Sequence, residues 1–203
     1  MDKKNTPKKK RERRDRSEEI LATATRLFSE HGYQGTTFSL LAEAVQLTEP
    51  GVLHYFPSKT HLLKSVLEYN EQKNAIRYYS MLQAKKKNIP DLFSLLEDMV
   101  AENEKVPGLI QLFTVLVSES IRSDHPAHDY FIGRYRRVRE AYVNQFFGEI
   151  RDKIPPDLDL NELTTIILAV MDGLQIQWLL DPEKVNMTRA YQLFSRIVVD
   201  FLT

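Results

Sequence analysis

Residues 38–59 read FSLLAEAVQLTEPGVLHYFPSK, and this stretch decides how the rest of the chain is interpreted. Apolar residues recur at helical spacing over 40–45, which predicts a first short helix. Thr48 is a good N-cap for a second short helix, and Pro50 suits its first turn because no helical hydrogen bond is lost there. Pro57 ends the pair because the residue before a proline disfavours helical geometry.

The second of these helices carries small, polar and aromatic side chains instead of a second apolar face. Isolated helices shorter than about 12–15 residues are marginal in water, so a short helix this polar needs another role. Lying in the DNA major groove, with its N-terminal residues against base edges, is the role that the pattern favours. We therefore interpret residues 38–59 as a helix-turn-helix.

Apolar periodicity, capping residues and prolines predict an all-α chain of about nine helices, with no strand and no internal repeat. A capping box at Asp15–Glu18 is expected to open the first helix, and Gly32 is expected to end it in the left-handed conformation. Thr36 or Thr37 is the expected cap of the next helix. The later helices are expected at Ser58 to about Lys87, Asp91–Lys105, Gly108–Ile121, Ala127–Lys153, Asn161–Leu180 and Met187–Leu202.

The charge of the chain is unevenly distributed although its formal net charge is zero. Residues 1–16 hold nine Lys or Arg against three Asp or Glu, so this arm is basic and the remainder is acidic by the same amount. A basic arm on an acidic body is typical of nucleic-acid binders, and the alternative is a solvated tail. We expect three parts: a flexible basic arm (1–16), a helix-turn-helix domain (17–65), and a larger helical domain (66–203).

Several classes of function find no support in the sequence. The absence of cysteine excludes disulfides and thiolate sites and is consistent with a reducing cytoplasm. No run approaches the roughly 18 apolar residues of a membrane span, so we expect no membrane partner. We also expect no enzyme, because no glycine-rich phosphate loop or strained serine elbow occurs. His125 and His128 have metal-ligand spacing, but they flank a proline at a helix start, where Asp124 and His125 are interpreted as capping residues, so no metal or cofactor is predicted.

The first 65 residues resemble the DNA-binding domain of the TetR/AcrR family of bacterial transcriptional regulators. Several segments carry the resemblance: Ala24, Leu27-Phe28, Gly32-Tyr33, Thr36-Thr37, Leu41-Ala42, Val45, the run Leu53–Lys59 and Leu62-Leu63. One position departs from the family pattern, because Gln46 stands where the family has glycine in the turn. A non-glycine residue there must either adopt a left-handed conformation or reshape the turn.

The resemblance implies an all-helical homodimer whose last two helices pair in a four-helix bundle, with two reading heads about one DNA turn apart on a near-palindromic operator. Thr48, Glu49 and Gly51 would face base edges, His54 and Tyr55 would contact phosphate or thymine methyl groups, and Thr37 and Lys59 would contact phosphate. Packing of the module on itself is the alternative for His54 and Tyr55, and solvent for Glu49. Leu41, Leu53 and Phe56 are interpreted as core.

A small apolar or amphipathic effector would bind between the long helices of the larger domain. The expected walls are Phe113, Val117, Phe131, Tyr135, Gln175 and Trp178, with Glu119, Arg134 and Asp172 as polar anchors; plain core packing is the alternative for each. The predicted function is a sequence-specific transcriptional repressor released from its operator by this effector. The alternative is a helical DNA-binding protein without a small-molecule effector, constitutive or controlled by a protein partner.

Overall fold

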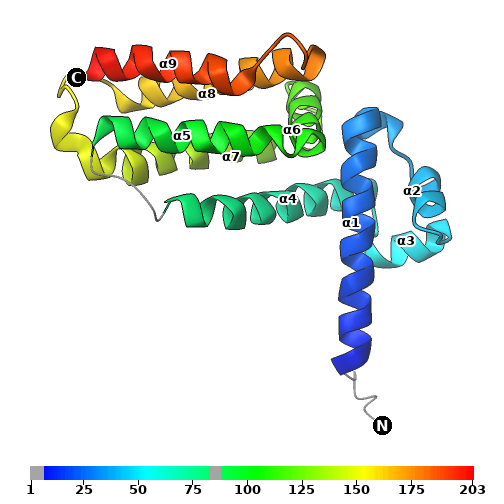
Figure 1. Ribbon diagram of the computed structural model, residues 1–203. Coiled ribbons are helices and arrows are strands. Elements are labelled where there is room, and N and C mark those ends of the chain that lie inside the picture. The colour runs from blue at the N-terminus through cyan, green and yellow to red at the C-terminus, as the bar shows by residue number, and fades with distance from the viewer. Residues whose placement is uncertain (1–6, 83–87) are drawn as a thin grey trace.

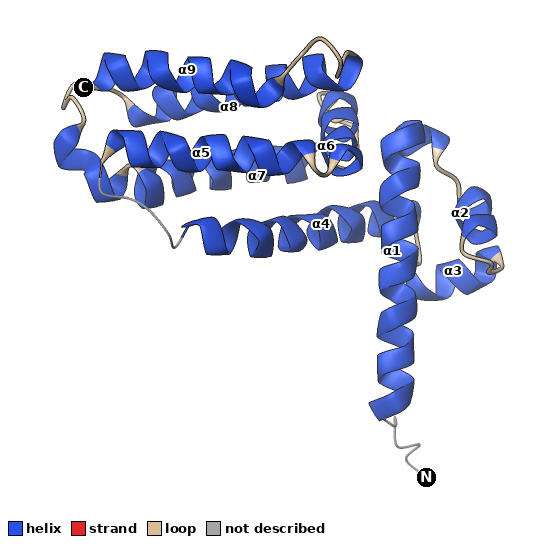
Figure 2. Ribbon diagram, viewed as in Figure 1, coloured by secondary structure: helices blue, strands red, loops and turns tan. Residues whose placement is uncertain are grey.

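The computed structural model describes residues 7–82 and 88–203, and every regular element in these two ranges is a helix (Figures 1 and 2). The all-α prediction is therefore confirmed. The α-helices are α1 (Pro7–Gly35), α2 (Phe38–Ala44), α3 (Glu49–Tyr55), α4 (Lys59–Leu82), α5 (Ile89–Glu104), α6 (Pro107–Glu119), α7 (His128–Ala141), α8 (Leu160–Leu180) and α9 (Met187–Leu202). A π-helical turn (Tyr142–Phe146) and a 3-10 segment (Gly148–Lys153) follow α7.

Helix α1 begins earlier than the sequence indicated. It starts at Pro7, so the predicted capping box at Asp15–Glu18 is wrong as a helix start. Lys, Arg and Glu are good helix formers, and the basic run therefore continues the helix instead of preceding it. The other end agrees with expectation, because Gly32 has a φ of 66° and breaks the regular helix.

One later helix also differs from its predicted bounds. The single helix expected at Ala127–Lys153 is α7 followed by the π-helical turn and the 3-10 segment, with a kink at Ile150. The buried aromatic residues Tyr142, Phe146 and Phe147 face one core, and the change of helix type brings all three inward. The predicted extension of α4 from Leu82 to Lys87 lies outside the described residues.

The first four helices form a head from which α4 runs toward a body built from α5 to α9 (Figure 1). The head core gathers buried residues of α1 to α4, among them Phe28, Leu41 and Leu63. The same core includes Leu112 and Leu116 of α6, because α6 packs directly against α1. The body core is a second cluster, between α5, α8, α9 and the segment 142–154.

Helix α8 is long and apolar enough to cross a membrane, and it is the one such helix in the described ranges. This differs from the expectation that no run approaches a membrane span. In the fold α8 packs against α7 and α9, and core helices of helical bundles pass the same test of length and composition.

Candidate nucleic-acid interface and effector cavity

Helix α3 is held on the head by its ends and by one buried side chain. Thr48 is the N-cap, and its hydroxyl oxygen accepts a hydrogen bond from the Gly51 N–H at 3.2 Å. Val52 is fully buried and fixes the helix against the head core. The Phe56 N–H donates to the Val52 carbonyl and ends the helix, because Phe56 is extended before Pro57. Glu49, Leu53 and His54 of α3 are exposed.

The turn between α2 and α3 keeps its shape although it lacks the glycine. Gln46 adopts a left-handed φ of 53° and is the one non-glycine residue in the described ranges with positive φ. The Gln46 and Leu47 N–H groups donate to carbonyls of α2, as a tight helix end requires. Arg16 of α1 donates a 2.6 Å hydrogen bond to the Val45 carbonyl, which ties the turn to α1.

The seven residues predicted to contact DNA differ in their exposure. Thr37, Thr48, Glu49 and His54 are exposed, whereas Gly51, Tyr55 and Lys59 are half-buried. Thr37 is the N-cap of α2 and accepts from the Leu40 N–H.

Lys59 contacts the end of α1, whereas Leu53 is exposed. The Lys59 ammonium group donates to the Gln34 carbonyl at 3.1 Å and lies 4.7 Å from the centre of the Tyr33 ring. Partial burial lowers the pKa of this ammonium group, and the Glu119 carboxylate partly opposes that effect. Leu53, predicted to be core, is 39% exposed on α3. It is an apolar side chain on the outward face that the sequence pattern did not distinguish from the buried ones.

The body contains a cavity of about 440 Å³, lined mainly by apolar and aromatic side chains from α4 to α8 and from the segment after α7. Seven of the nine residues predicted to hold an effector line this one cavity. They are Phe113, Val117, Phe131, Arg134, Tyr135, Asp172 and Gln175. This volume lies within the roughly 300–1,000 Å³ of ordinary small-molecule sites.

The polar chemistry of the cavity is concentrated around Tyr135. Its hydroxyl donates a 2.6 Å hydrogen bond to the Asp172 carboxylate. Burial raises the pKa of the Asp172 carboxyl, while the Tyr135 hydrogen bond and the nearby Arg134 charge partly oppose that rise. The guanidinium carbon of Arg134 lies 4.8 Å from the centre of the Phe113 ring.

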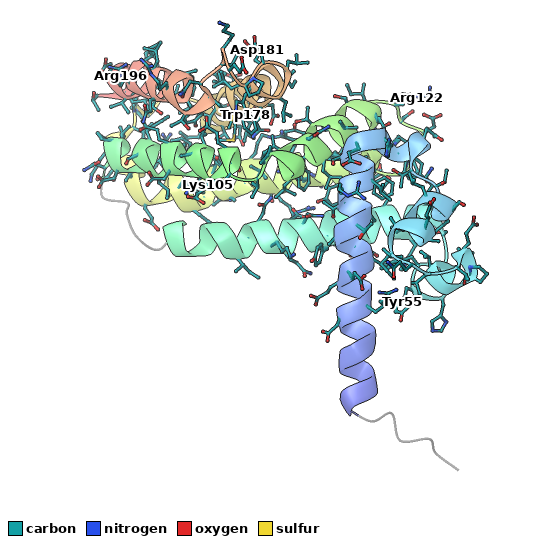
Figure 3. The ribbon with its side chains drawn as sticks, turned by 45° about the vertical axis from the view of Figure 1, so that its right-hand side comes forward. Tyr55, Lys105, Arg122, Trp178, Asp181 and Arg196 are labelled. Atoms are coloured by element: carbon teal, nitrogen blue, oxygen red, sulfur yellow. The ribbon has the colours of Figure 1, made fainter. Side chains whose placement is uncertain are left out.

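Glu119 and Trp178 do not line this cavity. Trp178 lies in the body, half-buried against the body core, whereas Tyr55 lies far from it on the head (Figure 3). Glu119 ends α6 and points to the head, where its carboxylate accepts the Tyr33 N–H at 2.8 Å. Phe113 and Val117, earlier in α6, line the cavity, whereas Glu119 at the end of the helix does not.

Glu119 is part of a junction between α6 and the end of α1. The imidazole ring of His125 packs edge-on against the Tyr33 ring at 5.1 Å, and its Nε2 atom lies 3.9 Å from the Glu119 carboxylate. The Ala127 N–H donates to Nδ1 of His125, which leaves the buried Nε2 atom without a hydrogen-bond partner. Burial lowers the pKa of His125, and the Glu119 and Asp124 carboxylates partly oppose that effect.

The predicted capping by Asp124 and His125 is not seen at α7, whose start has no side-chain cap hydrogen bond, although both histidines turn Nδ1 to the backbone. His128 Nδ1 lies 2.8 Å from the Ser120 carbonyl oxygen, and His125 accepts from Ala127. Over the described ranges no group of three or more His, Asp or Glu side chains is arranged to hold a metal ion.

Sequence reasoning missed several polar side chains that line the cavity: Glu71 and Asn74 on α4, Asn103 on α5, Thr114 on α6 and Gln145 after α7. One signal was available, because Asn103 continues the apolar stripe of Leu96 and Val100 at helical spacing. The α4 residues gave no such signal, because a polar residue on a long helix is ordinarily solvated.

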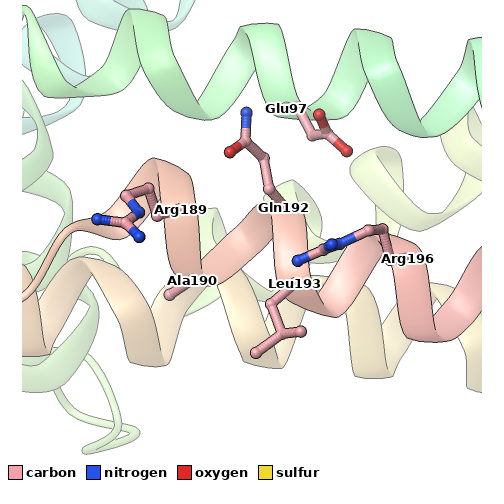
Figure 4. A pocket seen from close by; sticks show the side chains of 6 residues that line it. All are labelled: Glu97, Arg189, Ala190, Gln192, Leu193 and Arg196. Carbon is pink, nitrogen blue, oxygen red and sulfur yellow. The ribbon is translucent and has the colours of Figure 1, made fainter.

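A second hollow, of about 580 Å³, opens at the surface between α5 and α9 (Figure 4). Arg189, Gln192 and Arg196 of α9 and Glu97 of α5 give it a polar rim, and Ala190 and Leu193 complete its lining (Figure 4). It lacks the aromatic wall of the 440 Å³ cavity.

Comparison with known proteins gives two family matches. Residues 20–66 match the family described as bacterial regulatory proteins, tetR family. Residues 90–203 match the family described as BetI-type transcriptional repressor, C-terminal.

Individual relatives cover most of the chain. A nucleoid occlusion factor SlmA of Sodalis glossinidius is 29% identical over 190 residues, covering 91% of this chain and 93% of the relative. The HTH-type transcriptional repressor AcnR of Corynebacterium diphtheriae is 28% identical over 163 residues, or 78% of each chain. A solved transcriptional regulator from Saccharomonospora viridis, in complex with choline, superposes with a TM-score of 0.71 at 20% identity, over 90% of this chain and 94% of that one.

Proposed function

Because the chain belongs to the TetR family of bacterial transcriptional regulators and is therefore a DNA-binding regulator, we propose that it is a repressor that leaves its operator when a small molecule fills the body cavity. It would act in the bacterial cytoplasm as a homodimer. The observation that carries the effector claim is the cavity itself, a mainly apolar volume of about 440 Å³ with a few converging polar groups. The alternative, a regulator without an effector, would need no such volume in its body.

The proposed dimer would form through α8 and α9. Both helices expose large apolar side chains: Ile166, Ile176 and Leu180 on α8, and Leu193, Ile197 and Phe201 on α9. The α9 residues recur every four positions, so they form a single stripe. Gly173 stands on the α8 stripe, and a Cβ atom there would meet nothing within 4 Å in the subunit. Close approach of a partner helix would account for a glycine that the subunit itself does not require.

In the proposed complex each α3 helix would enter one major groove, with the two heads about 34 Å apart. Thr48 and Glu49 would reach base edges from the N-terminal end of α3, with Gly51 allowing close approach of the backbone. His54 would contact phosphate or a thymine methyl group, and the exposed Leu53 would contact a thymine methyl group. Thr37 would donate to phosphate. Lys59 would also donate to phosphate. Its ammonium group has three N–H donors and the Gln34 carbonyl accepts from one of them, so two remain for phosphate.

The proposed signal would pass from the cavity to the head along α6. Phe113 and Val117 of α6 line the cavity, and Glu119 at the end of the same helix holds the Tyr33 N–H of α1. A shift of α6 would therefore displace α1, and α4 would follow because it also lines the cavity through Glu71. Only an effector that binds the released conformation more tightly than the operator-bound one can drive this change.

The test begins with a footprint on the DNA that flanks the protein's own coding region. Affinity for the protected site is then compared with affinity for random duplex of the same length and at the same salt concentration. We expect a ratio of about 10³ or more, and a ratio near one would leave only nonspecific binding. Thr48→Val, which removes the cap and a candidate base contact, should lower the ratio. Ser39→Ala, an exposed α2 change outside the proposed contacts, should not.

Effector control is tested separately, by operator release on titration with small molecules. If no compound that binds the body changes operator affinity, the effector-free alternative is correct.

A further inference from the structure

We propose that the effector is an amphipathic carboxylate whose anionic head pairs with Arg134 and whose apolar chain lies along the aromatic wall of the cavity. This inference rests on the proposed function and specifies the chemistry of the same cavity. It starts from the charges that line the cavity: among the side chains that the structure describes, these are Glu71, Arg134 and Asp172, and Arg134 is the single cation among them.

In the described ranges Arg134 is a cation whose charge interacts with the Asp172 carboxylate but forms no ion pair with it. It makes no hydrogen bond or ion pair there, and its contacts are with the rings of Phe113 and Tyr135, at 4.8 and 6.0 Å. Arg137, one turn further along α7, is different because it forms a 3.0 Å ion pair with Glu71. The N–H groups of Arg134 are thus available, and a planar guanidinium group matches a carboxylate through two parallel hydrogen bonds.

Glu71 and Asp172 repel a bound anion less strongly than two free carboxylates would. Glu71 is neutralised by Arg137 and also accepts a hydrogen bond from the Tyr130 hydroxyl at 3.0 Å. The Asp172 carboxylate accepts the Tyr135 hydroxyl, and burial raises its pKa, so this group is more readily neutralised than an ordinary aspartate. Among the described side chains of α4 to α8, no other Asp, Glu, Lys or His lines the cavity.

A ligand cation fits the same walls less well. Asp172 and several aromatic rings would attract one, but Arg134 already lies over the face of Phe113 and would repel a second positive charge at the same place. The remaining walls, among them Phe131, Val138 and Met171, are apolar and suit a hydrocarbon chain. One charged head at Arg134 and one apolar chain is therefore the complementary pattern.

The experiment compares three probes of equal chain length on the full-length protein: decanoate, decanol and decyltrimethylammonium. Binding is measured by titration calorimetry, and release by the loss of operator binding. We expect decanoate to bind at least about tenfold more tightly than decanol, because hydrogen bonds to a charged group contribute roughly 1.5–3 kcal/mol. Decanoate should also release the operator.

Three variants separate charge recognition from structure. Arg134→Gln should abolish the advantage of decanoate over decanol. Arg136→Gln, which removes the same charge from an exposed position of α7 outside the cavity, should keep that advantage. Asp172→Asn retains an acceptor for Tyr135 and removes a negative charge, so it should tighten decanoate binding and weaken any binding of decyltrimethylammonium. Melting temperatures establish that each variant is folded.

Tighter binding of decyltrimethylammonium than of decanoate, equal binding of decanoate and decanol, or an unchanged preference in Arg134→Gln would each overturn the proposal. The same preparation is assayed for operator binding without any probe. A protein that binds its operator specifically but none of the three probes refutes this inference alone, whereas a protein without specific DNA binding refutes the proposed function.

Discussion

Gln46 holds a backbone conformation that suits glycine. Its φ of 53° is left-handed, which costs an L-residue roughly 1–2 kcal/mol. Gln46→Gly should remove that strain, while the greater freedom of glycine in the unfolded chain offsets about 0.5–1 kcal/mol of the gain. We expect a net stabilisation of about 0.5–1 kcal/mol, seen as a rise of about 1–4 °C in melting temperature. Gln46→Ala keeps the strain and is the control; an equal rise for both variants would contradict this explanation.

Gly32 is required for a different reason, because the space for a side chain is already filled. A Cβ atom added there would lie 2.3 Å from the Glu119 carboxylate, at a φ of 66°. Gly32→Ala should therefore destabilise the protein by about 2 kcal/mol or more, through backbone strain and loss of the Glu119–Tyr33 hydrogen bond. Gly108→Ala is the matched control in α6, because its Cβ would meet nothing within 4 Å. Denaturant unfolding of the two variants measures the difference, and equal stabilities would refute the assignment.

At this scale the residues that act locally were the ones predictable from sequence. The caps at Thr37 and Thr48 and the left-handed Gly32 follow from their immediate neighbours, and the structure has all three. Arg16 and Glu119 were assigned to the basic arm and to the cavity, whereas they bind the Val45 carbonyl and the Tyr33 N–H. Each of these contacts joins elements far apart in the chain, and local patterns carry no information about such pairs.

At the scale of elements, the junction between α6 and α1 contains a group that titrates near neutral pH. The pKa of His125 is lowered in the folded protein from its ordinary value near 6.5, chiefly by burial. The unfolded chain therefore takes up a proton first as the pH falls. The stability that comes from keeping His125 neutral is complete above about pH 6.5 and is lost as the pH falls from there toward the folded pKa.

His125→Phe removes this proton site while keeping a ring against Tyr33. We expect the variant to be less stable than the parent at pH 8, because the Ala127 N–H loses its acceptor. Its stability should nevertheless fall less steeply between about pH 6.5 and 5. Urea unfolding at several pH values measures the slope. Parallel profiles for variant and parent would show that His125 does not contribute to the acid sensitivity.

Helical periodicity in the sequence did not predict where one helix changes its type. The run 127–153 has continuous helical spacing, yet the chain changes from α-helix to a π-helical turn at Tyr142. Tyr142, Phe146 and Phe147 must all reach one core, and straight helical geometry points only some of them there. The helices on the other side of this core decide which way the three rings must point. The sequence of 127–153 alone therefore does not predict the change of helix type.

At the scale of the whole molecule, the head and the body are less separate than the sequence indicated. Leu112 and Leu116 of α6 and Phe131 of α7 complete the head core, although they follow the expected boundary at residue 65 by more than 40 positions. The cavity likewise takes side chains from α4 through α8. The number of helices and the candidate reading helix were readable from the chain, but this shared core was not. Movement in the body therefore has a direct packed route to the head.

The proposed dimer is tested by placing a charge on the α9 stripe. Ile197 is 61% exposed in the subunit, and its burial against a partner would make Ile197→Asp very costly. Two-fold symmetry puts the change in the interface twice, so a cost of about 2 kcal/mol per copy would weaken the dimer about a thousandfold.

Sedimentation measures the mass of the Ile197→Asp variant. Its affinity for the operator should fall in parallel, because two linked heads bind more tightly than one. Ile121→Asp, at a 79% exposed position after α6, is the control that should remain dimeric. A dimer that survives Ile197→Asp unchanged would mean that the subunits pair through another surface, and that the spacing of the two α3 helices has to be derived from that surface instead.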